Sequence, residues 1–420
     1  MKNFLVHDEN TRAEMLESIG LKGIEDLFKQ IPQTARMGEL NLEKPLSEMD
    51  LQKRIKQIAK ENKTDYVSFV GGGIYNKFVP AAISQVANRF EFLTAYTPYQ
   101  AEVAQGTLQI MYEFQTMMCR LTGMDIANAT VYDGATACAE SILMAVRIAK
   151  KNKVLVSEKL NPEYLQVVKT YTWANGIEVE YFDEIPANTA DYAAVLVQTP
   201  DYYGEITEFK AVDCLSIICC DISTLSILKT PAEMGADIVA ADIQTLGMPM
   251  NFGGPHAGIL ACKEKYMRQL PGRLAGRTVD ADGNQAFTLT IQTREQHIKR
   301  EKATSNICSN QALMGLWATL YLSLMGEDGF RQAGYLSAKN AHLLSEKLAK
   351  KGVKTLNKNF FNEFVIEVED ADEFLNRLKA NNILGGIKLD DHRILVATTE
   401  MNSAEEIERY VATLAERSEK

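Results

Sequence analysis

The central part of the chain alternates short apolar runs with helical stretches. Apolar spacing over residues 108–121 predicts a helix that ends at Gly123, and a second helix follows Gly134. Short apolar runs then occur at 154–156, 177–182, 193–197, 215–220, 238–241 and 258–262. Runs of this length, apolar on both faces and separated by helices, are typical of a parallel sheet that is covered on both sides. We therefore predict a mostly parallel, doubly wound α/β domain over residues 96–325.

The flanking regions have different patterns. From residue 1 to about residue 65 there is no β-rich apolar run. Ser47 and Asp50 form a capping-box-like start before a predicted amphipathic helix. This pattern predicts a helical arm and linker over residues 1–95, with a turn at the glycine run 71–73. Residues 326–420 predict a smaller α+β domain, with helices at 333–350 and after Ser403 and strands near 364–366 and 393–397.

The charge and the cysteine content of the chain argue against several classes of protein. Lys and Arg number 45 and Asp and Glu 55, a formal net charge of −10, which argues against a general nucleic-acid binder or an anionic-membrane protein. No run approaches the roughly 18 apolar residues of a spanning helix, and the first residues show no secretory signal. The seven cysteines are scattered without a C-x-x-C pair, so we expect reduced thiols and a cytoplasmic protein.

Two predicted strand-to-helix junctions carry residues that could contact a ligand. Asp133, Gly134, Ala135 and Thr136 open a helix, whose free N–H groups can bind phosphate; an N-capped helix with a tight entry is the alternative interpretation. Asp221 ends a predicted strand, where a carboxylate can hold a proton on a pyridine-type nitrogen; a cap for the following turn is equally compatible.

A third predicted strand-to-helix junction contains no lysine. Residues 242–246 follow a predicted strand and precede a Gly-Gly-Pro-His sequence at 253–256. Between Asp221 and Lys263 the only lysine is Lys229, which comes before that strand. No lysine therefore occupies this junction.

A fourth candidate region is the polar run 293–306. Its part from Lys299 to Lys302 is compatible with a solvated helix face, whereas Thr304, Ser305 and Asn306 suit a helix cap or a ligand contact. The chain contains no P-loop, G-x-G-x-x-G, H-E-x-x-H or G-x-S-x-G motif, and its five histidines lack ligand spacing, so we predict no metal site.

Several motifs resemble those of one family along the whole chain. They are Met15–Gly20, Gly71–Tyr75, Tyr96–Gln100, Tyr132–Thr136 and Thr293–Asn306. The chain resembles the fold-type-I pyridoxal-phosphate enzymes, and within them the glycine cleavage system P-protein family, specifically the first (alpha) subunit of its two-subunit form. One departure is Ala101, where the family pattern has proline.

The resemblance implies a reaction and a set of partners. Glycine would lose its carboxyl carbon as CO2 with pyridoxal phosphate as electron sink, and the aminomethyl group would pass to the lipoyl arm of H-protein. In the family a lysine holds the cofactor at the junction that corresponds to Gln244 and Thr245, neither of which has a primary amine. We therefore expect a catalytically incomplete chain with a degenerate cofactor pocket at Asp133–Thr136 and Asp221. A homologous, lysine-bearing subunit 2 (beta) would hold the cofactor in an alpha2-beta2 heterotetramer.

The residues expected to contact substrate or the partner subunit are polar or aromatic. They are Tyr96, Tyr99, Gln100, Arg294, His297, Lys299, Arg300, Thr304, Ser305 and Asn306. Two other functions remain open at this point: an autonomous pyridoxal-phosphate lyase or aminotransferase, and a non-catalytic scaffold subunit.

Overall fold

The computed structural model describes residues 8–38, 41–209, 212–304, 307 and 311–414, which fall into two compact units, 1–64 and 65–420. The elements of the first unit are α1 (Glu9–Ser18), η1 (Ile24–Phe28), η2 (Gln33–Ala35) and α2 (Glu48–Glu61). Ser47 caps α2 by accepting a hydrogen bond from Asp50 N at 3.2 Å, which confirms the predicted start of this helix. None of the described residues of this unit is buried.

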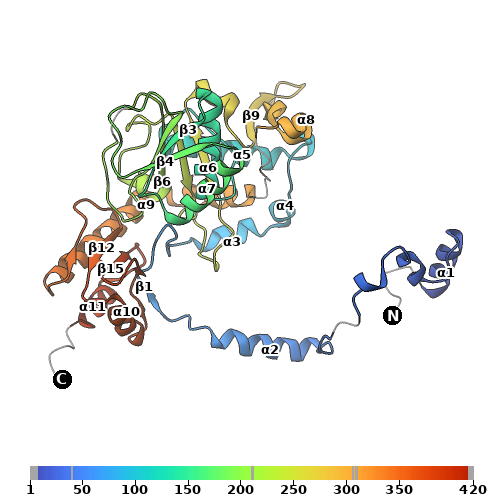
Figure 1. Cartoon of the computed structure of the whole chain (residues 1–420), viewed down its shortest axis with the longest axis horizontal. Helices are drawn as coiled ribbons and strands as arrows, with labels where there is room; N and C mark the ends of the chain where they lie inside the picture. Colours follow the sequence, from blue (N-terminus) through green and yellow to red (C-terminus); the bar gives the residue numbers. More distant parts are fainter. Residues whose placement is uncertain (1–7, 39–40, 210–211, 305–306, 308–310, 415–420) are drawn as a thin grey trace. The chain divides into compact units, whose positions relative to one another are not determined.

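The second unit is built around a seven-stranded sheet with the order β2-β8-β7-β6-β5-β3-β4 (Figure 1). These strands are β2 (Ile126–Ala127), β3 (Lys153–Ser157), β4 (Glu178–Phe182), β5 (Ala194–Gln198), β6 (Leu215–Asp221), β7 (Ile238–Asp242) and β8 (Gly258–Cys262). Strands β7, β6, β5, β3 and β4 are parallel to one another, and β8 is antiparallel to both β7 and β2. The predicted mostly parallel α/β sheet is confirmed.

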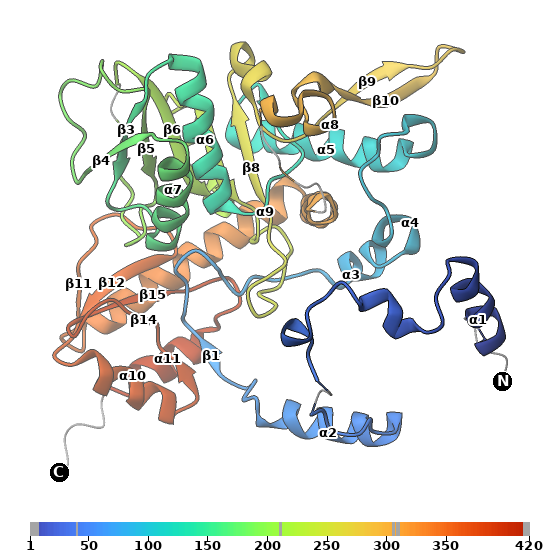
Figure 2. The same cartoon turned by 45° about the vertical axis from the view of Figure 1, so that its right-hand side comes forward.

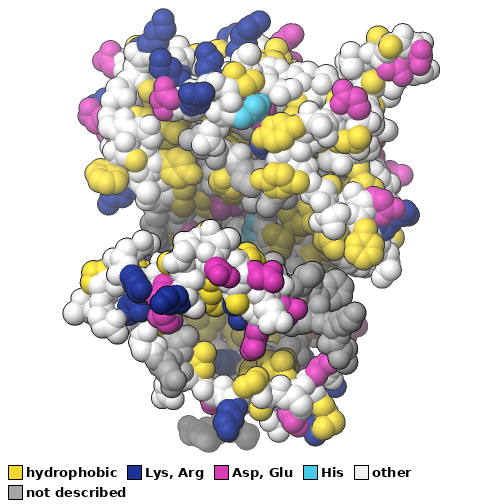
Figure 3. Space-filling view, turned by 90° about the vertical axis from the view of Figure 1, so that its right-hand side faces the viewer, with side chains coloured by type: hydrophobic (Ala, Val, Ile, Leu, Met, Phe, Trp, Pro, Cys, Tyr) yellow, Lys and Arg dark blue, Asp and Glu magenta, His cyan; other side chains and the backbone are white. Residues whose placement is uncertain are grey.

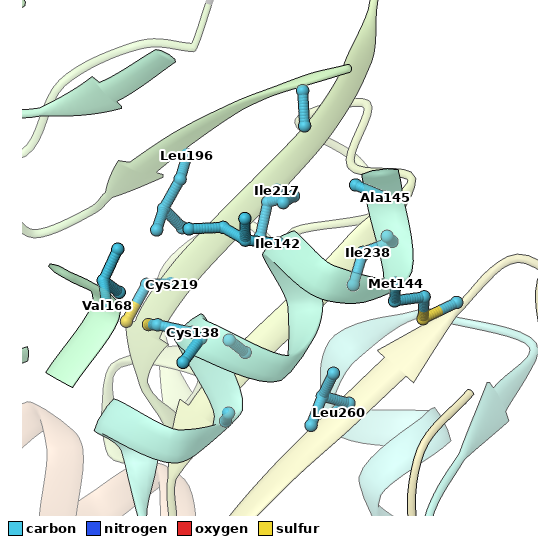
Figure 4. Packing of buried hydrophobic residues seen from close by; sticks show 14 of the residues in the cluster. Cys138, Ile142, Met144, Ala145, Val168, Leu196, Ile217, Cys219, Ile238 and Leu260 are labelled. Atoms are coloured by element: carbon cyan, nitrogen blue, oxygen red, sulfur yellow. The ribbon is translucent and has the colours of Figure 1, made fainter. Parts of the chain in front are cut away.

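Helices cover both faces of this sheet because successive strand residues point to opposite sides. On one face, α6 (Gly134–Ala149) and α7 (Pro162–Ala174) pack on strand residues such as Ile217 and Cys219. Figure 4 shows side chains of α6 lying against these strands. On the other face, α5 (Gln105–Thr122) and α9 (Ala312–Ala349) pack on Ile218 and Cys220.

Three features differ from the predicted pattern. Strand β4 is not apolar on both faces, because it is an edge strand whose Glu178 and Glu180 side chains form ion pairs with Lys153. The helix predicted at 333–350 is the second part of α9, which is interrupted by non-helical backbone at Gly326. An unpredicted hairpin, β9 (Leu274–Val279) and β10 (Gln285–Thr290), packs on α5 (Figure 2).

The C-terminal part contains a second sheet with the order β11-β12-β15-β14, covered by helices (Figure 2). Its elements are β11 (Lys354–Thr355), β12 (Glu363–Glu367), α10 (Ala371–Ala380), β13 (Ile383–Leu384), β14 (Ile387–Lys388), β15 (Arg393–Ala397) and α11 (Ala404–Ala412). Helix α11 begins with a complete capping box between Ser403 and Glu406, as predicted. Strand β1 (Val67–Ser68) pairs with β13. The domain boundaries at residues 95 and 325 stay predictions.

The remaining elements are short. They are α3 (Ala81–Ala87), α4 (Phe90–Leu93), η3 (Ala101–Val103), η4 (Ile222–Ser226), η5 (Glu264–Gln269), η6 (Gln292–Arg294), α8 (Gln296–Lys299) and η7 (Arg300–Lys302). Across the described ranges, no helix combines the length and the hydropathy that a bilayer crossing requires.

Candidate functional site

A small cavity lies where three parallel strands of the main sheet end. Gln198 ends β5, Asp221 ends β6 and Asp242 ends β7, and all three side chains line the cavity. Its other lining residues are Gly73, Tyr75, Asn161, Tyr164, Pro200, Asp201, Gly204, Cys219, Cys220, Thr224, Thr245, Phe361, Asn362 and Glu363. Open α/β sheets bind ligands at this edge. The volume, about 40 Å³, is enough for a few water molecules.

Asp221 caps the turn that follows β6 and also lines the cavity. Its Oδ1 accepts hydrogen bonds from Ser223 N and from Thr245 Oγ1, each at 2.9 Å. Burial raises the pKa of Asp221, while the nearby charge of Lys77 and these hydrogen bonds oppose the rise. The carboxylate therefore caps η4 and also forms part of the cavity wall.

The two residues at the expected lysine position point in different directions. Thr245 lines the cavity and donates its hydroxyl to Asp221. Gln244 is buried and turned toward Tyr75: its Oε1 accepts from Tyr75 N at 3.1 Å and its Nε2 donates to Tyr75 O at 3.0 Å. Thr245 is thus the residue of this pair that faces the cavity, and Gln244 holds the segment after the glycine run.

That segment is also fastened to the C-terminal sheet by Glu363. This buried carboxylate accepts hydrogen bonds from Gly72 N at 2.6 Å and from Tyr75 Oη at 2.9 Å. Burial raises the pKa of Glu363 to about 7, with a contribution from the charges of Asp221 and Asp201. Burial likewise raises the pKa of Asp201, another wall residue, to about 6.

Two carboxylates occupy the start of α6. Asp133 Oδ1 accepts from Thr136 N at 2.7 Å, and Asp242 Oδ2 accepts from Gly134 N at 3.0 Å. Asp133 therefore caps this helix, as the capped-helix interpretation expects. None of the residues 133–136 lines the cavity, although Asp242 does.

A buried lysine that no sequence motif revealed, Lys77, lies close to this region. Lys77 Nζ lies 3.1 Å from Glu400 Oε2 and 2.9 Å from Ser337 Oγ. Lys77 does not line the cavity. A single lysine in a loop has no distinctive sequence signal, so only the packing reveals its ion pair.

A second cavity, of about 220 Å³, brings together four of the predicted contact residues. It is lined by Tyr99, Arg294, His297 and Thr304 from the prediction, and by Pro271, Gly272, Arg273, Glu295, Gln296 and Ile307. Arg294 is buried and donates from Nη2 to Gly272 O at 3.0 Å and from Nε to Ile291 O at 3.3 Å. Two of its donors are therefore engaged within the chain.

Arg273, which no sequence motif singled out, also lines the second cavity. Its Nη2 donates to Tyr99 Oη at 3.1 Å, and its Nε lies 3.3 Å from Glu295 Oε2 without hydrogen-bond geometry. The Tyr99 ring also meets His297 edge to face, with centroids 5.0 Å apart. The result is a partly enclosed pocket with arginine, imidazole and phenol groups.

The other predicted contact residues lie elsewhere. Tyr96 lines a third, mostly apolar cavity of about 40 Å³, while Gln100, Lys299 and Arg300 are exposed. Ser305 and Asn306 lie outside the described residues.

Comparisons with known proteins agree with this fold and cover nearly the whole chain. The sequence model of a family described as glycine cleavage system P-protein matches residues 2–414. Similar curated proteins include probable glycine dehydrogenase (decarboxylating) subunit 1 of Geobacillus thermodenitrificans, 42% identical over 99% of each chain. The protein of the same description from Thermotoga petrophila is 44% identical over 97% of this chain and 98% of its own.

Solved structures give the same result. A glycine decarboxylase (P-protein) of the glycine cleavage system, in inhibitor-bound form, has a TM-score of 0.89 at 37% identity, over 98% of this chain and 99% of its own. An aspartate aminotransferase from Thermus thermophilus has a TM-score of 0.57 at 13% identity, over 83% of this chain and 99% of its own, and so shows the fold alone. The chain has the fold of the fold-type-I pyridoxal-phosphate enzymes and belongs to the glycine cleavage system P-protein family.

Proposed function

We propose that this chain is the subunit of a two-subunit glycine decarboxylase that does not hold the cofactor. The observation that carries the proposal is Thr245, whose hydroxyl donates to Asp221 at the cavity where the cofactor lysine is expected. A hydroxyl cannot form a Schiff base, which requires a primary amine. Decarboxylation therefore depends on a homologous, lysine-bearing partner subunit.

The residues of this chain do not fit pyridoxal phosphate. Within the described part of the chain, the cavity wall includes no lysine or arginine but contains the carboxyl groups of Asp201, Asp221, Asp242 and Glu363. A phosphate would meet like charges there. The cofactor, when bound to the partner, supplies an electron sink for the carbanion that decarboxylation leaves.

The proposed reaction takes glycine as substrate. Glycine loses its carboxyl carbon as CO2, and its aminomethyl group passes to the lipoyl arm of H-protein. We assign the enzyme to the cytoplasm and to an alpha2-beta2 assembly. The described cysteines are all free thiols, as a reducing compartment favours.

The second cavity supports a direct contribution of this chain to the shared site. Arg273 offers a planar guanidinium that suits a carboxylate, and Tyr99 and His297 lie beside it. Tyr99 is also 49% exposed. Figure 3 shows one face of the molecule, on which hydrophobic side chains are exposed between charged ones. We propose that the partner subunit covers this pocket and that Arg273 binds the carboxylate of glycine or of an interface residue.

Co-expression with the candidate partner subunit tests the proposal. The isolated chain should show no exchange of labelled bicarbonate into glycine, and the purified complex should show it. Borohydride reduction and peptide mapping of the complex should place the cofactor label on a lysine of the partner. Exchange by the isolated chain would refute the proposal, and binding without any effect on the partner's rate would favour a scaffold role.

The role proposed for Arg273 can be tested by substitution, with a nearby arginine, Arg277, as the matched control. Replacing Arg273 by alanine should lower kcat/KM for glycine by roughly tenfold or more, since hydrogen bonds to charged groups contribute about 1.5–3 kcal/mol. Arg277→Ala removes an exposed arginine of β9 and should leave the rate unchanged. Equal effects of the two substitutions would exclude a specific role for Arg273.

A further inference from the structure

The start of α6 already has an anionic ligand from within the chain. Helix N-termini bind phosphate because their first N–H groups have no partner inside the helix. In this 16-residue helix the N–H of Gly134 donates to Asp242 at 3.0 Å, and that of Thr136 donates to Asp133 at 2.7 Å. The chain's own carboxylates therefore take the place of an external anion.

We propose that Asp242 is the residue that excludes phosphate-bearing cofactors from this chain, because its carboxylate accepts the N–H of Gly134 at the start of α6, where a helix can otherwise bind a phosphate. The inference deepens the proposed function and rests on it only in placing the cofactor on the partner. Two residues would then keep the cofactor from this chain. Thr245 prevents its covalent attachment, and Asp242 prevents binding of its phosphate.

Space and charge both support this role. A Cβ added at Gly134 would lie 2.5 Å from Tyr164 Oη and 2.9 Å from Asp242 Cβ, so the chain is closely packed around Gly134 at this helix start. The Asp242 side chain is 11% exposed, and Asp133 and Asp221 add negative charge nearby. The one imidazole that faces it among the described residues, His256, lies with Nδ1 3.7 Å from Asp242 Oδ2.

The test introduces an amine and then removes the barrier, in the full-length chain without its partner. The single variant Thr245→Lys is compared with the double variant Thr245→Lys/Asp242→Ser. Each is incubated at pH 8 with pyridoxal phosphate or with pyridoxal, which has the same aldehyde but no phosphate. Borohydride reduction then fixes any Schiff base, and peptide mapping quantifies the label at position 245.

The inference predicts an effect that depends on the phosphate. Adding Asp242→Ser should raise labelling by pyridoxal phosphate at least about tenfold, as the loss of a close like charge allows. Labelling by pyridoxal should change by less than about twofold. Inorganic phosphate should compete with pyridoxal phosphate in the double variant and have no effect in the single variant.

A control separates the position of Asp242 from the general charge of the cavity. Asp201→Asn, combined with Thr245→Lys, removes a negative charge from the wall but leaves the start of α6 capped. An increase equal to that from Asp242→Ser would overturn the inference. So would equal labelling by pyridoxal phosphate with and without Asp242→Ser, or failure of pyridoxal to label Thr245→Lys.

Folding of each variant is checked by far-UV circular dichroism and cooperative unfolding. If Asp242→Ser does not fold, Asp242→Asn replaces it, since the amide is similar in size and keeps an acceptor for Gly134. An unchanged ratio of pyridoxal phosphate to pyridoxal labelling in that variant counts against the inference. None of these measurements depends on glycine exchange, so a failure here is distinct from a failure of the proposed function.

Discussion

Glu363 gives this fold a pH-dependent stability that a single substitution can isolate. The carboxyl group is buried and accepts hydrogen bonds from Gly72 N and Tyr75 Oη. Glu363→Gln keeps the shape of the side chain and one acceptor, and the phenol can accept from the new amide. The variant therefore removes the titration with little change in packing.

The magnitude follows from the shift in pKa. Burial raises the pKa of Glu363 from 4.5 to about 7, and one pKa unit corresponds to about 1.4 kcal/mol, so the full effect is roughly 3 kcal/mol. Because the folded-state pKa is above the unfolded one, the folded state binds the proton more tightly. Stability from this group is complete below pH 4.5 and is lost as the pH rises through 7.

Urea unfolding of both proteins at pH 5, 6.5 and 8 measures the effect. The difference in unfolding free energy should move in favour of Glu363→Gln by about 2.5 kcal/mol between pH 5 and pH 8. Asp201 and Asp221 titrate in both proteins, so their direct contributions largely cancel. Glu367→Gln, at an exposed position of the same strand, is the control and should show no such trend. A pH-independent difference for Glu363→Gln would show that Glu363 does not titrate as described.

Three further substitutions test contacts around the first cavity. Gln244→Leu leaves the buried N–H and C=O of Tyr75 without their partner, and should lower the unfolding free energy by roughly 2–4 kcal/mol in urea; a loss under about 1 kcal/mol would contradict this. Lys77→Met leaves the buried carboxylate of Glu400 unpaired and should cost about 3–5 kcal/mol, seen as a lower Tm; replacing both partners by apolar residues should restore part of it. Gly258→Ala would place a Cβ 2.2 Å from a backbone oxygen at the start of α6, so soluble yield and protease resistance should fall. Wild-type behaviour of this variant would show that the close approach is absent.

Local patterns were sufficient for the main architecture. Short apolar runs separated by helices predicted the parallel core of the sheet, and Ser403 with Glu406 predicted the start of the last helix, which the structure confirms. Both signals depend on neighbouring residues only: a buried strand needs a continuous apolar run, and a helix cap needs a side chain within one turn of the first N–H groups. The edge strand β4 does not have a continuous apolar run, because most of its residues are exposed to solvent.

Local residue patterns were enough to predict the α/β class, the place of Asp221 at the end of a strand and the lack of an amine at residues 244–245. The packing of the folded chain, in contrast, was needed to show that Thr245 faces the cavity while Gln244 holds Tyr75. It also decided the pairing of Lys77 with Glu400, which are 323 residues apart. The physical reason is that a side chain's partner across the fold depends on how sheets and helices pack, and a local pattern of apolar and polar residues does not contain that information.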